Sequence, residues 1–359
     1  MRLMEDMTNI INDQRKVVEP PRAEWLALGQ EDALEPELPI CDAHHHLFDL
    51  PGFPYLLPQY LDDLASGHDV RSTVYVECTA FYRASGEPAM RPVGETEVAA
   101  GVSAMAASGR YGPAKIVEAI VPFADLGIGS AIESVLEAHC AAGGGRVKGI
   151  RHASGWDASD YVKNSHTNPP RGLLLDERFR AGFALLAKYG LSFDAWLYHP
   201  QLPELLDLAR AFPEQPIVID HLGGLLRFAP YHQRQQEEQV AWRQSLQALA
   251  ACPNVCIKLG GLGMKSFGFG YGKMPVPPGS KQLARDWAPL LDICIDAFGP
   301  ARCMFESNFP VDKQSFSYSA MWNAFKRYAA GASPAEKTAL FSGTASAFYR
   351  LRPVAGSAQ

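Results

Sequence analysis

The sequence Leu38-Pro-Ile-Cys-Asp-Ala-His-His-His46 joins a short apolar run directly to three histidines. An apolar run of this length followed at once by polar side chains is typical of a buried parallel strand and its carboxyl end. In an extended backbone Asp42, His44 and His46 would point to one side of the strand, and the residue between the last two would point to the other. Two neutral imidazoles at this spacing can bind one divalent ion, while a nearby carboxylate holds a ring tautomer. The stretch therefore predicts a strand that ends in a metal site.

Further apolar runs follow the first, and amphipathic stretches of helical length separate them. The predicted strands are residues 38–42, 72–78, 115–122, 146–151, 191–197, 216–220, 254–260 and 302–306. The predicted helices are residues 95–108, 128–141, 177–189, 203–212, 235–252, 282–298, 319–330 and 334–351. Strands that alternate with helices in this number indicate an α/β fold, the (β/α)₈ TIM barrel. The alternative, an open doubly wound sheet, would need a G-x-G-x-x-G turn after its first strand, and the sequence has none there.

The barrel is predicted to span residues 38–352 as a single domain, with an N-terminal arm or extension at residues 1–37 and a tail at residues 353–359. Three long segments, residues 79–92, 152–175 and 261–280, each follow a predicted strand. Because the active sites of barrels lie at the carboxyl ends of the strands, we expect these segments to form a lid or a substrate wall. The last contains Phe267-Gly-Phe-Gly-Tyr-Gly272, which either closes over a ring or forms a mobile surface loop.

The composition argues against several classes of partner. The 359 residues carry a net charge of -6, and the pI is 5.9, so no excess of Lys and Arg is available for nucleic acid or an anionic membrane. No apolar stretch reaches the roughly 18 residues of a membrane span, and residues 1–16 lack the apolar core of a secretory signal. The seven cysteines are scattered and odd in number, as expected for reduced thiols. These features predict a cytoplasmic protein and leave a homo-oligomer open.

Several polar residues follow the later predicted strands. Arg151 and His152 end the fourth strand, His199 follows the fifth, His221 ends the sixth and Lys258 ends the seventh. In a parallel barrel the carboxyl ends of all strands open on one mouth. These side chains are therefore expected near the first-strand histidines.

Four motifs together resemble the amidohydrolase superfamily, and within it the lactonases related to 2-pyrone-4,6-dicarboxylate hydrolase and to sugar lactonases. The motifs are Asp42-Ala-His44-His-His46-Leu-Phe48, Val147-Lys-Gly-Ile-Arg151, Ile219-Asp-His221-Leu-Gly-Gly224 and Phe305-Glu-Ser-Asn308-Phe-Pro-Val311. The resemblance implies that His44 and His46 bind a metal ion, or polarise the scissile carbonyl in members that work without one. It also implies that His199 supplies a third ligand, that His221 lines the pocket and that Arg151 binds a substrate carboxylate.

The eighth-strand motif departs from the family pattern. Family members usually carry an aspartate there that binds metal and acts as the general base, whereas this chain has Asn308. An amide cannot accept the proton of an attacking water, and it is a weaker ligand than a carboxylate. Three carboxylates could compensate, those of Glu77, Glu306 and Asp312. Glu77 is the preferred base because strand-end residues project into the mouth of a barrel, and Glu306 has the parity of an inward-facing residue.

The sequence thus predicts a hydrolase that acts on a lactone, or a related acyl bond, of a small carboxylated substrate. The residues expected to hold a divalent metal ion, zinc by preference, are His44, His46 and His199, and no organic cofactor is expected. The catalytic residues are expected to be His221, Glu77 and Asn308. The residues expected to contact the substrate are Arg151, His152, Lys258 and His199. Two alternatives stay open: a nonoxidative decarboxylase of an aromatic or unsaturated acid, and a catalytically silent protein that binds a small acid.

Overall fold

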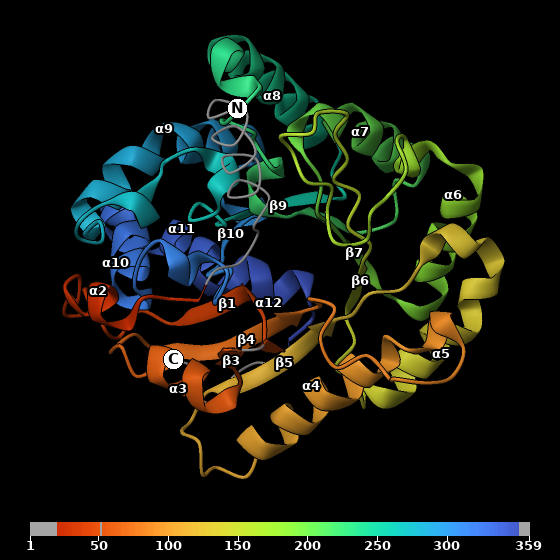
Figure 1. Cartoon of the computed structure of the whole chain (residues 1–359), viewed down its shortest axis with the longest axis horizontal. Coiled ribbons are helices and arrows are strands. Elements are labelled where there is room, and N and C mark those ends of the chain that lie inside the picture. Colours follow the sequence, from red (N-terminus) through yellow and green to blue (C-terminus); the bar gives the residue numbers. More distant parts are fainter. Residues whose placement is uncertain (1–19, 51, 352–359) are drawn as a thin grey trace, which may run out of the picture.

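A computed structural model describes residues 20–50 and 52–351, and in that part of the chain a ring of strands lies inside a layer of helices (Figure 1). The parallel strands follow one another around the ring in sequence order. They are β1 (Ile40–His45), β4 (Val70–Val76), β5 (Lys115–Val121), β6 (Gly149–Arg151), β7 (Ser192–Ala195), β8 (Ile217–Ile219), β9 (Val255–Leu259) and β10 (Cys303–Phe305). Each of them overlaps one of the predicted strands.

Main-chain contacts join the three-stranded sheet β1-β4-β5 to the five-stranded sheet β6 to β10 at both of their junctions. At the junction of β5 and β6, Ile120 bridges to Val147. At the junction of β10 and β1, the backbone N–H of Asn308 donates to the His44 carbonyl. The backbone N–H of His46 donates to the Phe309 carbonyl, and both distances are 2.8 Å. The ring therefore closes, and the predicted TIM barrel is confirmed.

Helices cover the outside of the ring. Those that follow the strands are α4 (Val93–Ala106), α5 (Glu133–Ala142), α6 (Glu177–Ala184), α7 (Leu202–Ala211), α8 (Gln235–Ala250), α9 (Ser280–Phe298), α10 (Tyr318–Tyr328), α11 (Pro334–Thr338) and α12 (Thr344–Phe348). A hairpin that the sequence did not predict, β2 (Phe48–Leu50) and β3 (Phe53–Tyr55), leads into α3 (Leu57–Leu64) after the first strand. No helix of residues 20–50 and 52–351 has the length and apolar character to cross a bilayer.

Two of the predicted helices differ from the observed ones for local reasons. The helix expected over residues 128–141 begins only at Glu133, because Gly129 has a φ of 69° inside a preceding 3₁₀ segment. The helix expected over residues 334–351 is divided by a π-helical turn, Ala339–Gly343, between α11 and α12.

The segment before β1 packs on the barrel from Arg22 onward, just before α2 (Ala23–Ala27) begins. The Trp25 indole donates to the carbonyl of Met274 at 3.0 Å, and Glu31 accepts from the amide of Ser280 at 2.6 Å. This part of the expected arm therefore lies against the segment that follows β9. Residues 1–19 of the arm and the expected tail at residues 353–359 lie outside the described residues.

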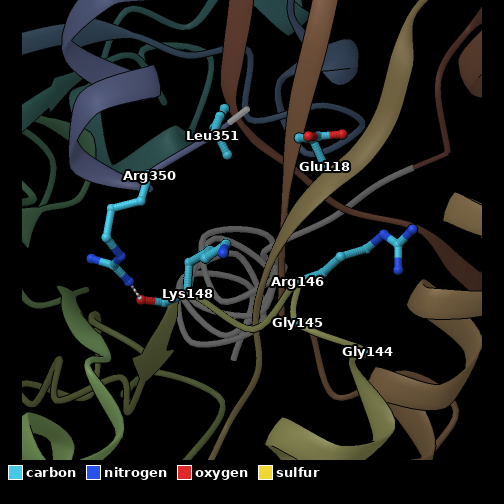
Figure 2. A pocket seen from close by; sticks show the side chains of 7 residues that line it. All are labelled: Glu118, Gly144, Gly145, Arg146, Lys148, Arg350 and Leu351. Carbon is cyan, nitrogen blue, oxygen red and sulfur yellow. Dashed lines mark hydrogen bonds between the residues drawn. The ribbon is translucent and has the colours of Figure 1, made fainter. Parts of the chain in front are cut away.

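The barrel interior changes character along its length. Small and branched residues such as Ala43, Val76 and Ala119 form an apolar layer with Tyr349 from the C-terminal end of the described chain. A small cavity of about 150 Å³ lies nearby, where Arg350 donates to the Lys148 carbonyl at 2.8 Å (Figure 2). Beyond the apolar layer, toward the carboxyl ends of the strands, the interior side chains are polar. The chemistry therefore gathers at that end of the barrel.

Candidate active site

A cavity of about 590 Å³ opens at the carboxyl ends of the strands. Its polar base includes His46, Arg151, His221 and Asn308. Its walls come from the β2–β3 hairpin and from the segments after β4, β6, β7 and β9; they include Phe48, Phe81, Val162, His166, Trp196, Tyr198, Met264 and Lys265. The cavity thus has the size and mixed lining of a small-molecule site.

The Phe267-to-Gly272 run does not contribute an aromatic lid. Phe267 and Tyr271 are buried in the main apolar core, and the ring of Phe269 stacks on that of Tyr271 at 5.1 Å. The part of this segment that reaches the cavity is its start, Met264 to Ser266. The alternation of aromatic residues and glycines therefore serves packing.

Asp42 does not lie on the side of the strand that carries His44 and His46, where a regular strand would place it. The pairing of β1 with β4 has a register shift between Asp42 and His45, as at a β-bulge. The Asp42 carboxylate accepts from the hydroxyls of Tyr60 and Tyr318 at 2.9 and 3.1 Å, on the helix side of the strand. The predicted common side for Asp42, His44 and His46 is therefore wrong, because the extra residue reverses the parity.

His44 and His46 nevertheless converge inside the barrel. Their Nε2 atoms lie 3.2 Å apart. The Nδ1 atom of His46 lies 2.8 Å from the Val76 carbonyl, which can only accept a hydrogen bond. Burial also lowers the pKa of His46 well below its usual value. His46 is therefore neutral, with its Nε2 lone pair turned toward His44.

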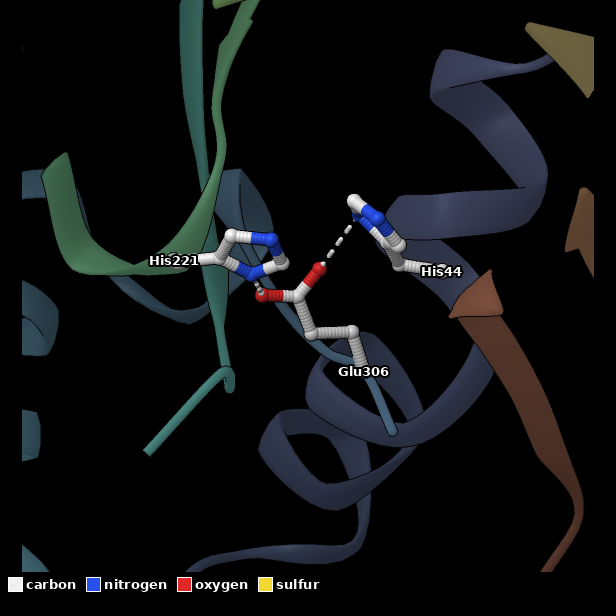
Figure 3. Close-up of side chains that lie close together, drawn as sticks. All are labelled: His44, His221 and Glu306. Carbon is white, nitrogen blue, oxygen red and sulfur yellow. Dashed lines mark hydrogen bonds and ion pairs between the residues drawn. The ribbon is translucent and has the colours of Figure 1, made fainter. Parts of the chain in front are cut away.

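His221 and Glu306 form the second element of the site, and they lie just after the ends of β8 and β10 (Figure 3). Nδ1 of His221 lies 2.6 Å from one Glu306 oxygen, and Nδ1 of His44 lies 3.0 Å from the other. Burial alone would raise the pKa of Glu306, but the two imidazoles lower it to about 2. The carboxylate is therefore ionised and holds the His221 ring by Nδ1, which leaves Nε2 toward the cavity.

Two glycines at the end of β9 make room for this pair. A Cβ atom on Gly260 would lie 2.3 Å from Cγ of Glu306. A Cβ atom on Gly261 would lie 2.6 Å from Cγ of His221, and Gly261 also has a left-handed φ of +69°. Any side chain at these positions would push the imidazole and the carboxylate apart.

Lys258 lies beneath His44 and is fully buried. Its ammonium lies 2.7 Å from Asp194, 3.0 Å from Asp220 and 3.2 Å from Nδ1 of His44. Burial would lower the pKa of Lys258, but Asp194 and Asp220 outweigh it and raise that pKa. Lys258 does not line the cavity. The structure thus places it as a buried support of His44, away from the position of a substrate contact.

Arg151 reaches the cavity from β6, but most of its donors are already used. Its Nε donates to Glu77 Oε1 at 2.7 Å, and its Nη2 donates to the Glu77 carbonyl. Its Nη1 lies 3.3 Å from Nε2 of His44. Arg151 therefore cannot offer a free two-pronged clamp to a substrate carboxylate, and only Nη1 faces the reacting centre.

Glu77, the preferred base of the sequence analysis, is also committed. One oxygen binds Arg151, and the other lies 3.0 Å from Nε2 of His166. Burial would raise the pKa of Glu77, but His166 and Arg151 lower it to about 2. A carboxylate so strongly acidic and so fully paired is a weak proton acceptor.

The structure places the remaining predicted residues apart from this centre or at its edge. Asn308 lines the cavity, and its Nδ2 donates to Asp312 at 2.9 Å. His199 accepts from the Leu226 amide at Nδ1, and its Nε2 lies 3.1 Å from Glu238, so neither nitrogen is left for a metal. His152 accepts from the Leu126 amide at 3.2 Å and does not line the cavity.

The surroundings of the two histidines account for these departures. His199 begins a 3₁₀ turn that leads into α7, four residues after the end of β7. The ring of His152 packs against the rings of Phe123 and Phe179. Their predicted roles as third ligand and as substrate contact do not match where the structure places them.

The residues present fit a divalent cation at one point. If His44 donates from Nδ1 to Glu306, both facing Nε2 atoms of His44 and His46 carry lone pairs 3.2 Å apart, as in a two-histidine metal site. In addition, among the residues that the structure describes, this centre pairs four carboxylates with two permanent cations, Arg151 and Lys258. The carboxylates are those of Glu77, Asp194, Asp220 and Glu306. His44, His221 and Glu306 also bring ligand-type atoms within 4.8 Å of one another. The Arg151 guanidinium, with Nη1 3.3 Å from Nε2 of His44, is the positive charge that a bound ion would face.

Three of the central residues have a weak signal in the sequence, or none. Only its strand parity indicated that Glu306 faces inward, although it binds two histidines of the site. Asp220, inside the sixth-strand motif, had the same inward parity as Val218 and could have been found by it. His166 had no local signal, because it comes from a long loop whose path the sequence does not specify.

Comparison with known proteins places the chain among enzymes of one family. Residues 41–351 match the family model described as Amidohydrolase. A protein of Sinorhizobium fredii, y4mH, is 38% identical over 204 residues, which are 57% of this chain and 61% of that protein. The L-fucono-1,5-lactonase of Burkholderia multivorans is 30% identical over 238 residues, which are 66% of this chain and 72% of the lactonase.

A solved structure agrees with this assignment. An amidohydrolase from Burkholderia multivorans with bound zinc has a TM-score of 0.67 and 25% identity, and the match covers 87% of this chain and 99% of that one. The resemblance seen in the strand-end motifs is therefore confirmed, and so is the prediction of a site suited to a divalent metal ion. By its matched length and by the histidines at its first and sixth barrel strands, the chain belongs to the amidohydrolase family.

Proposed function

We propose that this protein hydrolyses the lactone of a small sugar acid or related hydroxy acid. The observation that carries the proposal is the pairing of His221 with Glu306, 2.6 Å apart, beside the His44–His46 pair in the large cavity. A lactonase name among the relatives gives the substrate class. Arg151, which the sequence predicted to bind a substrate carboxylate, is bound to Glu77 instead, so the proposal does not require a carboxylate on the substrate.

His221 is the proposed general base. Glu306 accepts the Nδ1 proton, so that the neutral ring presents its Nε2 lone pair to a water molecule in the cavity. As the water attacks the carbonyl carbon, the ring takes its proton and the adjacent carboxylate stabilises the imidazolium. The His221–Glu306 pair thus takes the role of general base from the aspartate that the family usually carries at the position of Asn308. The Asn308 amide cannot accept a proton and so cannot fill that role.

Positive charge next to His44 would stabilise the oxyanion that develops on the carbonyl. Arg151 supplies it through Nη1, which is held in place because Glu77 fixes the rest of the guanidinium. A divalent ion would be held by His44 and His46, and when bound it polarises the carbonyl and lowers the pKa of an attacking water. The Lys258 ammonium and the Asp220 carboxylate pack beneath the His44 ring, 3.2 and 3.8 Å from its Nδ1 atom.

The direct test is a panel of sugar 1,4- and 1,5-lactones, with hydrolysis followed by proton release in a weakly buffered indicator assay. We expect turnover of at least one lactone well above the spontaneous rate, and no gas release from aromatic acids. Carbon dioxide release from a carboxylated aromatic acid, with every lactone inert, would favour the decarboxylase alternative. Inertness toward both classes would favour the silent binding protein.

Metal binding has a readout that does not depend on activity. Titration of chelator-treated protein with Zn²⁺ is expected to raise the melting temperature by about 5 °C at saturating concentrations, because a ligand that binds only the folded state stabilises it. A variant with His44→Gln and His46→Gln should show no zinc-dependent rise. An equal rise in this variant would place the ion elsewhere.

A further inference from the structure

We infer that His166 is a second catalytic residue of this site, the general acid that protonates the departing ring oxygen of the lactone. The inference rests on the proposed function. It starts from a repeated geometry: a buried carboxylate holds a cavity-lining imidazole both at His221–Glu306 and at His166–Glu77.

The His166–Glu77 contact joins a loop to the barrel. His166 belongs to the segment after β6, and its side chain is 29% exposed, whereas that of Glu77 is fully buried. Their Nε2 and Oε2 atoms lie 3.0 Å apart. Because Arg151 occupies the other Glu77 oxygen, the carboxylate remains ionised and accepts a proton-bearing nitrogen from His166.

The loop holds His166 in position from both sides. The Ser165 amide donates to the Gly155 carbonyl at 2.8 Å, and the Thr167 hydroxyl donates to the Ala153 carbonyl. The hydroxyl of Tyr198 donates to the Lys163 carbonyl. The imidazole is therefore presented to the cavity by an anchored backbone, and among the described residues no hydrogen bond occupies its Nδ1 atom.

The reaction balances with two histidines. His221 removes one proton from water as the water oxygen bonds to the carbonyl carbon. The bond from that carbon to the ring oxygen then breaks, its electron pair stays on the ring oxygen, and protonated His166 gives that oxygen its proton. Solvent takes the proton from His221 and returns one to His166, so the lactone and one water yield the hydroxy acid.

A leaving-group comparison tests this role. An alkoxide leaving group needs a proton as the bond breaks, whereas a phenolate, with a pKa of about 10 for its phenol, leaves without one. For His166→Gln we expect kcat on an aliphatic sugar lactone to fall by at least about 100-fold, and kcat on dihydrocoumarin, a phenolic lactone, to change by less than about threefold.

The matched control is His232→Gln, which changes an exposed histidine outside the cavity and should leave both rates unchanged. Melting temperatures of both variants check the fold. Equal losses on the two lactones, or no loss on either, would overturn the role of His166 while the proposed function stands. If the wild-type protein hydrolyses neither lactone type, the proposed function fails and the inference fails with it.

Discussion

Replacing His221 by asparagine should lower kcat for lactone hydrolysis by about 10²–10⁴-fold, the range expected for loss of a general base. The substitution is chosen for geometry. The asparagine Nδ2 can still donate to Glu306 as the ring Nδ1 does, and asparagine tolerates the left-handed φ of 52° at this position. What disappears is the basic Nε2 atom that faces the cavity. Steady-state kinetics on the best lactone of the panel measure the effect.

Two companion variants identify the cause of that loss. Glu306→Gln keeps the size of the side chain but removes the charge that stabilises the His221 imidazolium, so it should also reduce kcat strongly. The double variant should be little worse than the worse single variant, because residues that act as one unit are not additive. Activity of His221→Asn within a fewfold of wild type would show that the base lies elsewhere.

Replacing Lys258 by methionine should lower the free energy of unfolding by about 3–5 kcal/mol, the usual cost of removing one partner of a buried ion pair. The Lys258 ammonium neutralises Asp194 and Asp220, and all three side chains are inaccessible to solvent. Without it two carboxylates face each other in the barrel interior. Urea-induced unfolding followed by fluorescence measures the loss.

The counter-test adds Asp194→Asn to Lys258→Met. The side-chain amide introduced by Asp194→Asn removes one of the two carboxylate charges that lose their partner in Lys258→Met. Its oxygen can still accept from the Tyr349 hydroxyl. The double variant should therefore be more stable than Lys258→Met alone. The matched control is Lys188→Met, which breaks an exposed pair with Glu133 and should leave stability nearly unchanged. A loss at Lys258 no larger than at Lys188 would contradict a structural role for the buried pair.

The sequence by itself determined the architecture. Alternation of apolar runs with amphipathic stretches is a property of neighbouring residues, and it located every strand of the ring, including the short β6 and β8. It also identified the strand ends that carry His44, His46 and His221, because a parallel barrel brings all carboxyl ends to one mouth. These inferences need only local periodicity and the rule of the fold.

Which side chains meet in that mouth was decided by the tertiary structure alone. A bulge turned Asp42 outward against Tyr60 and Tyr318. Glu306 bound His221 across 85 positions of sequence, and Glu77 was paired with Arg151 and His166. The physical reason is that parity and spacing fix a direction only within one strand. Registers between strands, bulges and loop paths set the distances on which a metal site or a proton transfer depends.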